Sequence, residues 1–217
     1  MPDLDRPTPT TPKRQARSQV VRLALLDAAV HEFAACGFEA ASTRAIAARA
    51  GTHQPQINYH FASKADLWRA AVDHLFAQLN DVLVDALVPD ESGPAIATRE
   101  GFAGAIRAFV RASAKLPELN RIMVQEAVAG SDRLAWIVDR HIRPGFEVVI
   151  GAWNELLTRD EVPPIDAGVL YYSVIGGASL AYVNAAEARL LGIDPLDDRF
   201  VEAHADALVA MVLGPNT

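Results

Sequence analysis

The stretch STRAIAARAGTHQPQINYHFASK, residues 42–64, predicts two short helices joined by a tight turn. Ser42 or Thr43 supplies an N-cap oxygen for the first helix, and Gly51 allows the left-handed backbone that a sharp turn needs. The second helix is expected to begin near Gln54, because the proline that follows is tolerated in the first turn of a helix. Two short helices at this spacing indicate a helix-turn-helix.

The second of these helices has one apolar face and one polar face. Ile57 and Phe61 are expected to pack against Ile46 and Ala47 of the first helix. Uncharged donors and acceptors such as amides and imidazole read base edges in the major groove of DNA. Here they occupy the opposite face, at Gln54, Gln56, Asn58 and His60. The alternative is a helix pair that serves only as core structure.

The residues on either side of this stretch carry a wider pattern, from Leu25 to Leu67. It consists of Ala28-Ala29, Phe33, Gly37-Phe38, Thr43, Ile46-Ala47, Ala50-Gly51, Tyr59, Phe61 and Ser63-Lys64-x-x-Leu67. At these positions the chain resembles the DNA-binding domain of the tetracycline-repressor-like (TetR) transcriptional regulators. The resemblance covers the first third of the chain. It departs from the usual pattern at Thr52-His53 and at Asn58, which affects the expected operator sequence and not the fold.

The resemblance implies a set of DNA contacts and an assembly. Thr43 and Arg44 of the first motif helix are expected to face DNA, and Lys64 to bind a phosphate. The recognition-helix contacts are expected at Gln54, Pro55, Gln56, Asn58, Tyr59 and His60. The family pairs through its last two long helices, which implies a homodimer on a palindromic DNA operator. The function it implies is a transcriptional repressor that a small molecule releases.

Composition and charge agree with a DNA-binding protein that is basic at one end. The chain has 217 residues, of which 51% are hydrophobic and 22% charged, and its net charge is −7. Residues 1–64 contain eight Lys or Arg and five acidic residues, so the remainder carries −10. Cys36 is the single cysteine, and no run approaches the roughly 20 apolar residues of a membrane span. The N-terminal residues lack the apolar core of a signal peptide, and we expect a cytoplasmic protein.

The rest of the chain predicts an all-α fold with three parts. Residues 1–16 are expected to form a mobile arm, residues 17–64 the helix-turn-helix domain, and residues 65–217 a helical body. A long helix is expected from Ser63 to Pro89, followed by a turn-rich break as far as Pro94. Pro144 is expected to kink or divide a later helix, and the chain is expected to end in two helices.

Two patterns in the body indicate binding surfaces. Small and apolar residues of the last two helices are expected to form the dimer interface: Val174, Gly177, Ala178, Ala181, Ala185, Phe200, His204, Leu208 and Met211. A helix pair within one chain is the alternative. Aromatic residues with a polar minority are expected to line a pocket for a hydrophobic or aromatic ligand: Phe109, Arg121, Gln125, Trp136, Trp153, Tyr171, Tyr172 and Asn184.

An enzyme and an architectural DNA-binding protein are the two alternative functional classes. The six histidines show no spacing that pairs them with carboxylates or Cys36 as metal ligands, and neither a phosphate-binding glycine loop nor a nucleophile motif occurs. We therefore expect no enzyme, no cofactor and no metal site. An architectural DNA-binding protein without a ligand is the other alternative. The body contains more helix than a DNA-binding domain needs, which favours a ligand-responsive regulator.

Overall fold

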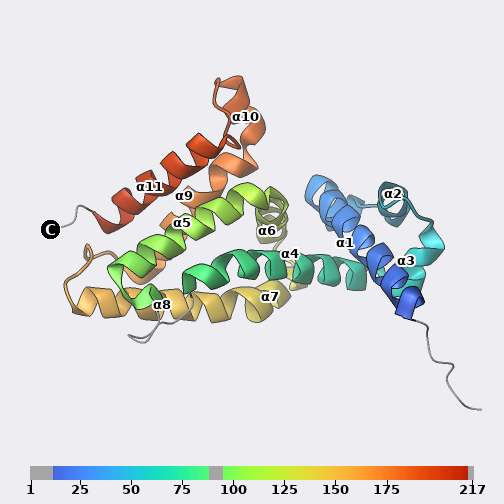
Figure 1. Cartoon of the computed structure of the whole chain (residues 1–217), viewed down its shortest axis with the longest axis horizontal. Helices are drawn as coiled ribbons and strands as arrows, with labels where there is room; N and C mark the ends of the chain where they lie inside the picture. Colours follow the sequence, from blue (N-terminus) through green and yellow to red (C-terminus); the bar gives the residue numbers. More distant parts are fainter. Residues whose placement is uncertain (1–11, 88–94, 215–217) are drawn as a thin grey trace, which may run out of the picture. The chain divides into compact units, whose positions relative to one another are not determined.

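The computed structural model describes residues 12–87 and 95–214, and within these ranges the regular structure is entirely helical, as predicted (Figure 1). The α-helices are α1 (Pro12–Ala40), α2 (Thr43–Arg49), α3 (Gln54–His60), α4 (Lys64–Leu87), α5 (Arg99–Lys115), α6 (Pro117–Ala129), α7 (Asp132–Ile137), α8 (Arg143–Thr158), α9 (Ala167–Val183), α10 (Ala185–Leu190) and α11 (Asp198–Leu213). A 3-10 turn, Ala95–Ala97, precedes α5, and a π-helical turn, Val138–Ile142, joins α7 to α8.

The chain divides into two compact units, Met1–His74 and Leu75–Thr217, which we call the head and the body. The boundary falls inside α4, whose first residues belong to the head and whose remaining residues belong to the body. The predicted arm, residues 1–16, lies outside the described residues as far as residue 11, and the chain is helical from Pro12. The predicted break at Pro89–Pro94 also lies outside the described residues.

The head is a three-helix core closed by the start of α4. The backbone of α1 breaks at Gly37, which adopts φ 75° and ψ 169°. This break turns Phe38 toward the core, where its ring lies 6.1 Å from that of Phe33 and 6.2 Å from that of Trp68. Ser63 caps α4, because its Oγ accepts the Asp66 N–H at 3.0 Å. The expected start of the long helix at Ser63 is confirmed.

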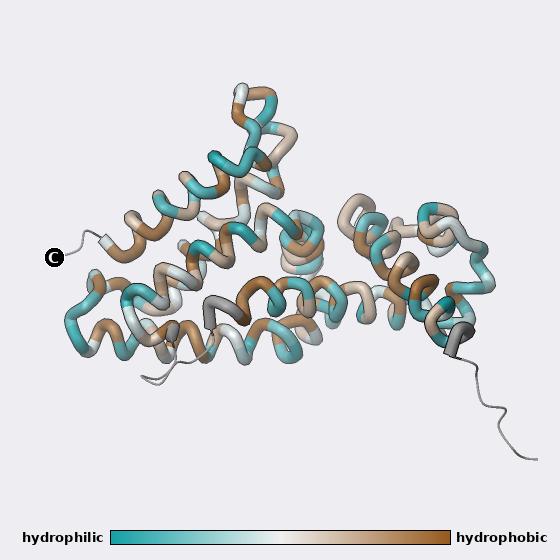
Figure 2. The backbone as a smooth tube through the Cα atoms, viewed as in Figure 1, coloured by the Kyte–Doolittle hydropathy of each residue, from teal (hydrophilic) through white to brown (hydrophobic). Residues whose placement is uncertain are grey.

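The body is a helical bundle around one core. Trp153 and Tyr182 are completely buried at its centre, together with residues from α5, α8, α9 and α11. Figure 2 shows hydrophobic and hydrophilic residues alternating along these helices, as expected for helices with one buried face. On the surface, two arginine–carboxylate pairs tie α5 to α11: Arg107 Nε to Asp206 at 2.9 Å, and Arg111 to both oxygens of Glu202 at 2.7 and 2.6 Å.

The structure of the body differs from the sequence prediction at the penultimate helix and adds detail at the helix that contains Pro144. The predicted penultimate helix is not continuous: it ends at Val183, Asn184 interrupts it, and α10 follows. Pro144 does divide its helix, as predicted, and the division takes the form of the π turn. Since proline has no N–H for the bond to residue 140, the turn widens and the Arg143 N–H bonds instead to the Val138 carbonyl, five residues back.

Candidate nucleic-acid interface and candidate body sites

The N-terminus of α2 is fixed to α1 by hydrogen bonds. The Ser42 N–H donates to Glu32 Oε1 at 3.1 Å, and Ser42 Oγ accepts the Ala45 N–H at 3.3 Å. Ser42 is thus the N-cap, and a carboxylate lies where the helix dipole favours negative charge. These contacts place Thr43 on the side of α2 that meets α3. There Thr43 Oγ1 accepts a hydrogen bond from Gln54 Nε2 at 3.2 Å, which joins two of the predicted DNA contacts.

Helix α3 has only seven residues, so packing rather than helix propensity must hold it. Its inward residue Ile57 is 2% exposed, and Phe61, which follows it, is 6% exposed. Gly51, with φ 64°, supplies the left-handed turn between α2 and α3. Ile46 and Ala47 of α2 are fully or nearly fully buried. The predicted division of this helix-turn-helix into a buried apolar side and an open side is therefore confirmed.

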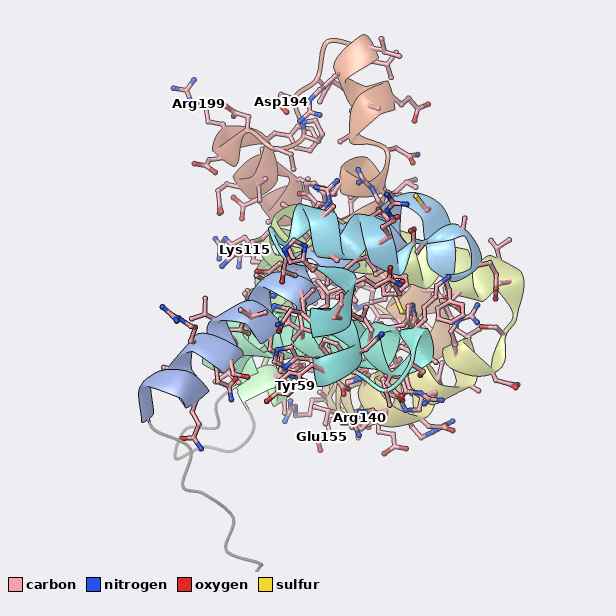
Figure 3. All side chains as sticks on the ribbon, turned by 90° about the vertical axis from the view of Figure 1, so that its right-hand side faces the viewer. Tyr59, Lys115, Arg140, Glu155, Asp194 and Arg199 are labelled. Carbon is pink, nitrogen blue, oxygen red and sulfur yellow. The ribbon has the colours of Figure 1, made fainter. Side chains whose placement is uncertain are left out.

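The open side of α3 presents the predicted polar residues. Gln54, Gln56 and Asn58 are exposed, and Tyr59, labelled in Figure 3, is 71% exposed. Of the remaining residues of the predicted DNA set, Pro55 and Arg44 are exposed, while Thr43, His60 and Lys64 are half-buried. Because the exposed donors and acceptors lie on one short helix, this side of α3 has the chemistry to read base edges.

Two cations beside this helix have contacts that the sequence did not indicate. Arg22 of α1 lies over the Phe61 ring, with its guanidinium carbon 5.3 Å from the ring centre. Burial, and next the positive charge of Arg22, lower the pKa of His60. Lys64 Nζ donates to the Glu39 carbonyl at 3.0 Å and lies 4.9 Å from the centre of the Phe38 ring. Lys64 therefore joins the first residue of α4 to the C-terminal end of α1.

Arg22 lies beside the C-terminal end of α3, although the predicted set of DNA contacts did not include it. Arg22 lies three and four positions before the buried Leu25 and Leu26 of α1, so helical periodicity places it on the buried face of this helix, where it is half-buried. Its proximity to Phe61 arises from tertiary packing, which periodicity within one helix does not report.

The predicted ligand residues of the body differ widely in burial. Trp153 is a core residue with no exposed surface, and its Nε1–H donates to the Ile165 carbonyl at 2.9 Å. Tyr172 is 75% exposed, and Asn184 is an exposed residue at the end of α9. Asn184 nevertheless lines an open groove of about 460 Å³ together with residues of α9 and α10. Trp153, as a sealed core position, and Tyr172, as an open surface position, do not line an enclosed pocket in this conformation.

The other predicted ligand residues lie half-buried on several helices. Phe109 packs against the body core, and Arg121 and Gln125 lie one turn apart on α6. Tyr171 meets Phe146 edge-on at 4.9 Å, and burial followed by the neighbouring Tyr172 raises the pKa of Tyr171. Their role in ligand binding stays a prediction.

Trp136 belongs to an aromatic cluster at the π turn. The ring of His141, in this turn, lies 4.3 Å from that of Phe76 of α4 with an angle of 5° between the two planes. The edge of the same imidazole meets Trp136 at 5.4 Å, and the guanidinium of Arg140 lies 5.7 Å from the Trp136 ring. His141 of the π turn thus contacts both a residue of α7 and a residue of the body part of α4.

Several residues predicted for the dimer interface pack within the chain instead. Ala178, Ala185 and Leu208 are buried in the body core. A Cβ at Gly177 would lie 3.0 Å from Leu208 Cδ1, so this glycine admits α11 of its own chain. The three buried residues serve packing within one chain, whereas Gly177 is exposed to solvent, and its place in the dimer interface stays a prediction. Tyr182 supports the packing of α9 against α11, since its hydroxyl lies 3.0 Å from His204 Nδ1.

The remaining residues of that predicted interface are open to different degrees. Val174, Ala181, Phe200 and His204 are half-buried, and Met211 is 70% exposed. Further apolar side chains on α9 are exposed, Val169 at 60% and Leu180 at 60%. The role of this face in dimerisation stays a prediction.

Over residues 12–87 and 95–214, no group of three or more His, Cys, Asp or Glu is arranged to hold a metal ion. Within the same ranges, the helices are all too short or too polar to span a bilayer.

The comparisons with known proteins agree with the geometry of the head. Residues 25–71 match the family model of the bacterial regulatory proteins of the tetR family. No curated protein sequence matches the chain.

Solved structures with the same fold cover nearly the whole chain. A TetR family transcription regulator from Marinobacter aquaeolei is 19% identical over 92% of this chain and 98% of its own, with a TM-score of 0.66. AibR in complex with isovaleryl coenzyme A and operator DNA is 18% identical over 90% and 99%, with a TM-score of 0.71. FadR from Bacillus subtilis in complex with stearoyl-CoA is 15% identical over 88% and 97%, with a TM-score of 0.64.

Proposed function

We propose that this chain, which carries the DNA-binding domain of the TetR family of bacterial regulators, is a transcriptional repressor that a small molecule releases from its operator. The repressor is a homodimer, and each head inserts α3 into the major groove of one half of a palindromic operator. The observation that carries this proposal is the open side of α3. It presents uncharged amides on a helix whose other side is fixed in the head by Ile57 and Phe61.

The DNA contacts fall into two groups. Gln54, Gln56 and Asn58 present amides to base edges, so they determine which sequence is preferred. Arg44 and Lys64 supply positive charge to phosphates, which strengthens binding to every sequence. Thr43, Pro55, Tyr59 and His60 complete the surface that meets the groove.

Selection of bound DNA from a random pool tests this assignment directly. A homodimer selects an inverted repeat whose half-sites are spaced by about one helical turn, roughly 34 Å, or a multiple of it. A pool that yields no repeat, with uniform and strongly salt-dependent binding, would instead identify a non-specific architectural protein.

The effector is proposed to be hydrophobic or aromatic and to bind in the body. The half-buried Phe109 and Trp136 supply apolar contacts, and Arg121 and Gln125 on α6 supply polar ones. Arg121 favours an effector with an anionic group. Two proteins of the same fold were solved with the coenzyme A thioesters isovaleryl-CoA and stearoyl-CoA. These two thioesters, together with free fatty acids and aromatic acids, form the first panel to titrate against operator affinity.

Coupling between effector and operator is proposed to act through α4. This helix begins directly after the Ser63 cap in the head and continues into the body as far as Leu87. In the body it carries Phe76, which stacks on His141 of the π turn. An effector that shifts α7 or the π turn therefore acts on α4. A nearly complete release requires the effector to prefer the non-binding form by about 10⁴-fold, or roughly 5.5 kcal/mol.

The variant Phe76→Leu tests this route, and Phe102→Leu is its matched control. Both phenylalanines are buried in the body, at 7% and 3% exposure, but Phe102 packs on Trp153 and not on the π turn. Both variants are expected to lose some stability. When the effector binds, operator affinity should fall less in Phe76→Leu than in Phe102→Leu. If the effector lowers operator affinity by the same factor in both variants, the proposed route is contradicted.

A further inference from the structure

A hydrogen bond joins the side chains of the two helices of the helix-turn-helix. Gln54 Nε2 donates to Thr43 Oγ1 at 3.2 Å, so the first residue of α3 is linked to the first residue of α2. Thr43 is half-buried, whereas Gln54 is exposed on the open side of α3. An amide of the base-reading helix therefore has a partner within the protein before DNA binds.

The backbone around this hydrogen bond is held by other contacts. Ser42 caps α2, because its Oγ accepts the Ala45 N–H at 3.3 Å, so the cap does not require the Thr43 hydroxyl. The turn that leads to α3 is tied to α2, since the Thr52 N–H donates to the Ala47 carbonyl at 2.9 Å. The Thr43 hydroxyl is thus held in place and available for contacts between side chains.

The direction of the hydrogen bond follows from the chemistry of the two groups. A glutamine amide nitrogen only donates, so the Thr43 oxygen is the acceptor and the hydroxyl keeps its own hydrogen for a further acceptor. Thr43 is predicted to face DNA, where phosphate oxygens are the usual partners of hydroxyl groups. Gln54 keeps a second N–H and its Oε1 for a base.

An amide with a fixed orientation discriminates between the two purines. In the major groove adenine presents an acceptor at N7 and a donor at N6, whereas guanine presents two acceptors, N7 and O6. An amide that donates to N7 and accepts from N6 pairs with adenine at both groups, but with guanine its oxygen meets O6. An amide that is free to turn over donates to O6 instead, so it also accepts guanine.

Contact of Thr43 with a phosphate prevents the amide from turning over. Once a phosphate oxygen accepts the Thr43 hydrogen, the hydroxyl can only accept. A reversed Gln54 amide would then place its Oε1 against Thr43 Oγ1, and two acceptors without a hydrogen between them repel each other.

We infer that Thr43 is a positioning residue, which uses a phosphate contact to fix the orientation of the Gln54 amide, and that Gln54 thereby selects adenine over guanine in each half of the operator. The inference rests on the proposed function, because it requires α3 in the major groove. It adds the base that Gln54 reads and the residue that makes this reading selective.

The test compares Thr43→Val with Thr43→Ser in the full-length protein. Valine has nearly the shape of threonine but no hydroxyl, and its helix propensity is similar, so thermal unfolding should stay close to that of wild type. Serine keeps the hydroxyl and is the matched control.

The measurement is the ratio of affinities for two operators that differ at one base. Selection from a random pool first locates the base position at which Gln54→Ala loses its preference. Operators then carry adenine or guanine at this position in one half-site only. Wild type and Thr43→Ser should prefer adenine by about 5-fold to 100-fold. In Thr43→Val this preference should fall by about 5-fold or more.

A double-mutant cycle shows whether Thr43 acts through Gln54. In a Gln54→Ala background there is no amide to release, so Thr43→Val should weaken binding to all duplexes by one common factor and leave every base preference unchanged. A phosphate contact from a neutral hydroxyl releases no counterion, so Thr43→Val should also keep the salt slope of wild type.

Three results would overturn the inference. The first is equal weakening of the adenine and guanine operators by Thr43→Val, which would leave Thr43 as a phosphate contact only. The second is a loss of preference at a base position that Gln54 does not determine. The third is selection of a base other than adenine by wild type at the Gln54 position.

These results are distinct from failure of the proposed function. If Gln56→Ala changes the base preference of the operator but Gln54→Ala does not, the positioning role of Thr43 fails alone. If replacement of Gln54, Gln56 and Asn58 in turn changes no base preference, α3 is not the reading helix, and the proposed function fails together with the inference.

Discussion

Replacement of Gln56 by alanine tests whether α3 reads DNA, because Gln56 is exposed while the next residue, Ile57, is only 2% exposed. A side chain that faces solvent contributes little to folding, so Gln56→Ala should change the unfolding free energy by less than about 0.5 kcal/mol. A bidentate amide–base contact contributes about 1–3 kcal/mol of discrimination. A dimer makes the contact twice, so the operator should lose about 2–6 kcal/mol, or roughly 30-fold to 10⁴-fold in affinity.

The assay is operator binding at one fixed salt concentration, with a random duplex as the non-specific reference. Gln56→Ala should weaken operator binding and relax the preference at one base position per half-site, while binding to the random duplex stays nearly the same. Ile57→Val is the matched control. It should lower the unfolding free energy by about 0.5–1.5 kcal/mol and, well below its melting temperature, leave the base preference unchanged.

An unchanged affinity and unchanged base preference in Gln56→Ala would refute the assignment of α3 as the reading helix. The same conclusion would follow if Gln56→Ala weakened binding equally to the operator and to the random duplex. Such a result would indicate a phosphate contact rather than a base contact.

Three further predictions concern charged groups. Lys64→Ala should weaken binding to every DNA sequence and reduce the salt slope by about one per head, which a salt titration measures. It should also lower the melting temperature in thermal unfolding, since Lys64 Nζ donates a hydrogen bond to the Glu39 carbonyl. Glu126→Ala should destabilise the body by about 1–3 kcal/mol in denaturant unfolding, because Glu126 is 3% exposed and accepts hydrogen bonds from Arg133 Nε at 3.1 Å and Ser131 Oγ at 2.6 Å. Arg22→Gln should raise the pKa of His60 toward its ordinary value in an NMR titration, since it removes one of the two causes that lower it; a fall would contradict the contact.

The head could be predicted from sequence in most of its detail because local signals determine it. The Ser42 cap, the Gly51 turn and the burial of Ile57 all depend on residues within a few positions of each other. Arg22 was missed because its place beside Phe61 depends on how α1 crosses the end of α3, a contact between residues 39 positions apart in sequence.

The body could be predicted only as a set of helices. Trp153 and Tyr172 look alike in sequence, as aromatics in helical patterns, yet one is sealed in the core and the other is exposed. Small residues on α9 predicted a close helix approach correctly, but periodicity cannot tell whether the approaching helix belongs to the same chain. The contact of Gly177 with Leu208 shows that, at this position, it does.

The interruption of the predicted penultimate helix at Asn184 explains the groove that residues of α9 and α10 line. A straight helix presents a convex ridge, and residues 176, 180, 187 and 191 would lie along one such ridge if α9 continued. Because the helix breaks at Asn184, these residues lie on two helices and the turn after them, and together they line a concavity. Asparagine lowers helix propensity by less than about 0.7 kcal/mol relative to alanine, so the sequence signal for this break is weak. The structural effect is large, since the break divides one predicted helix into two and shapes the groove that residues of both helices line.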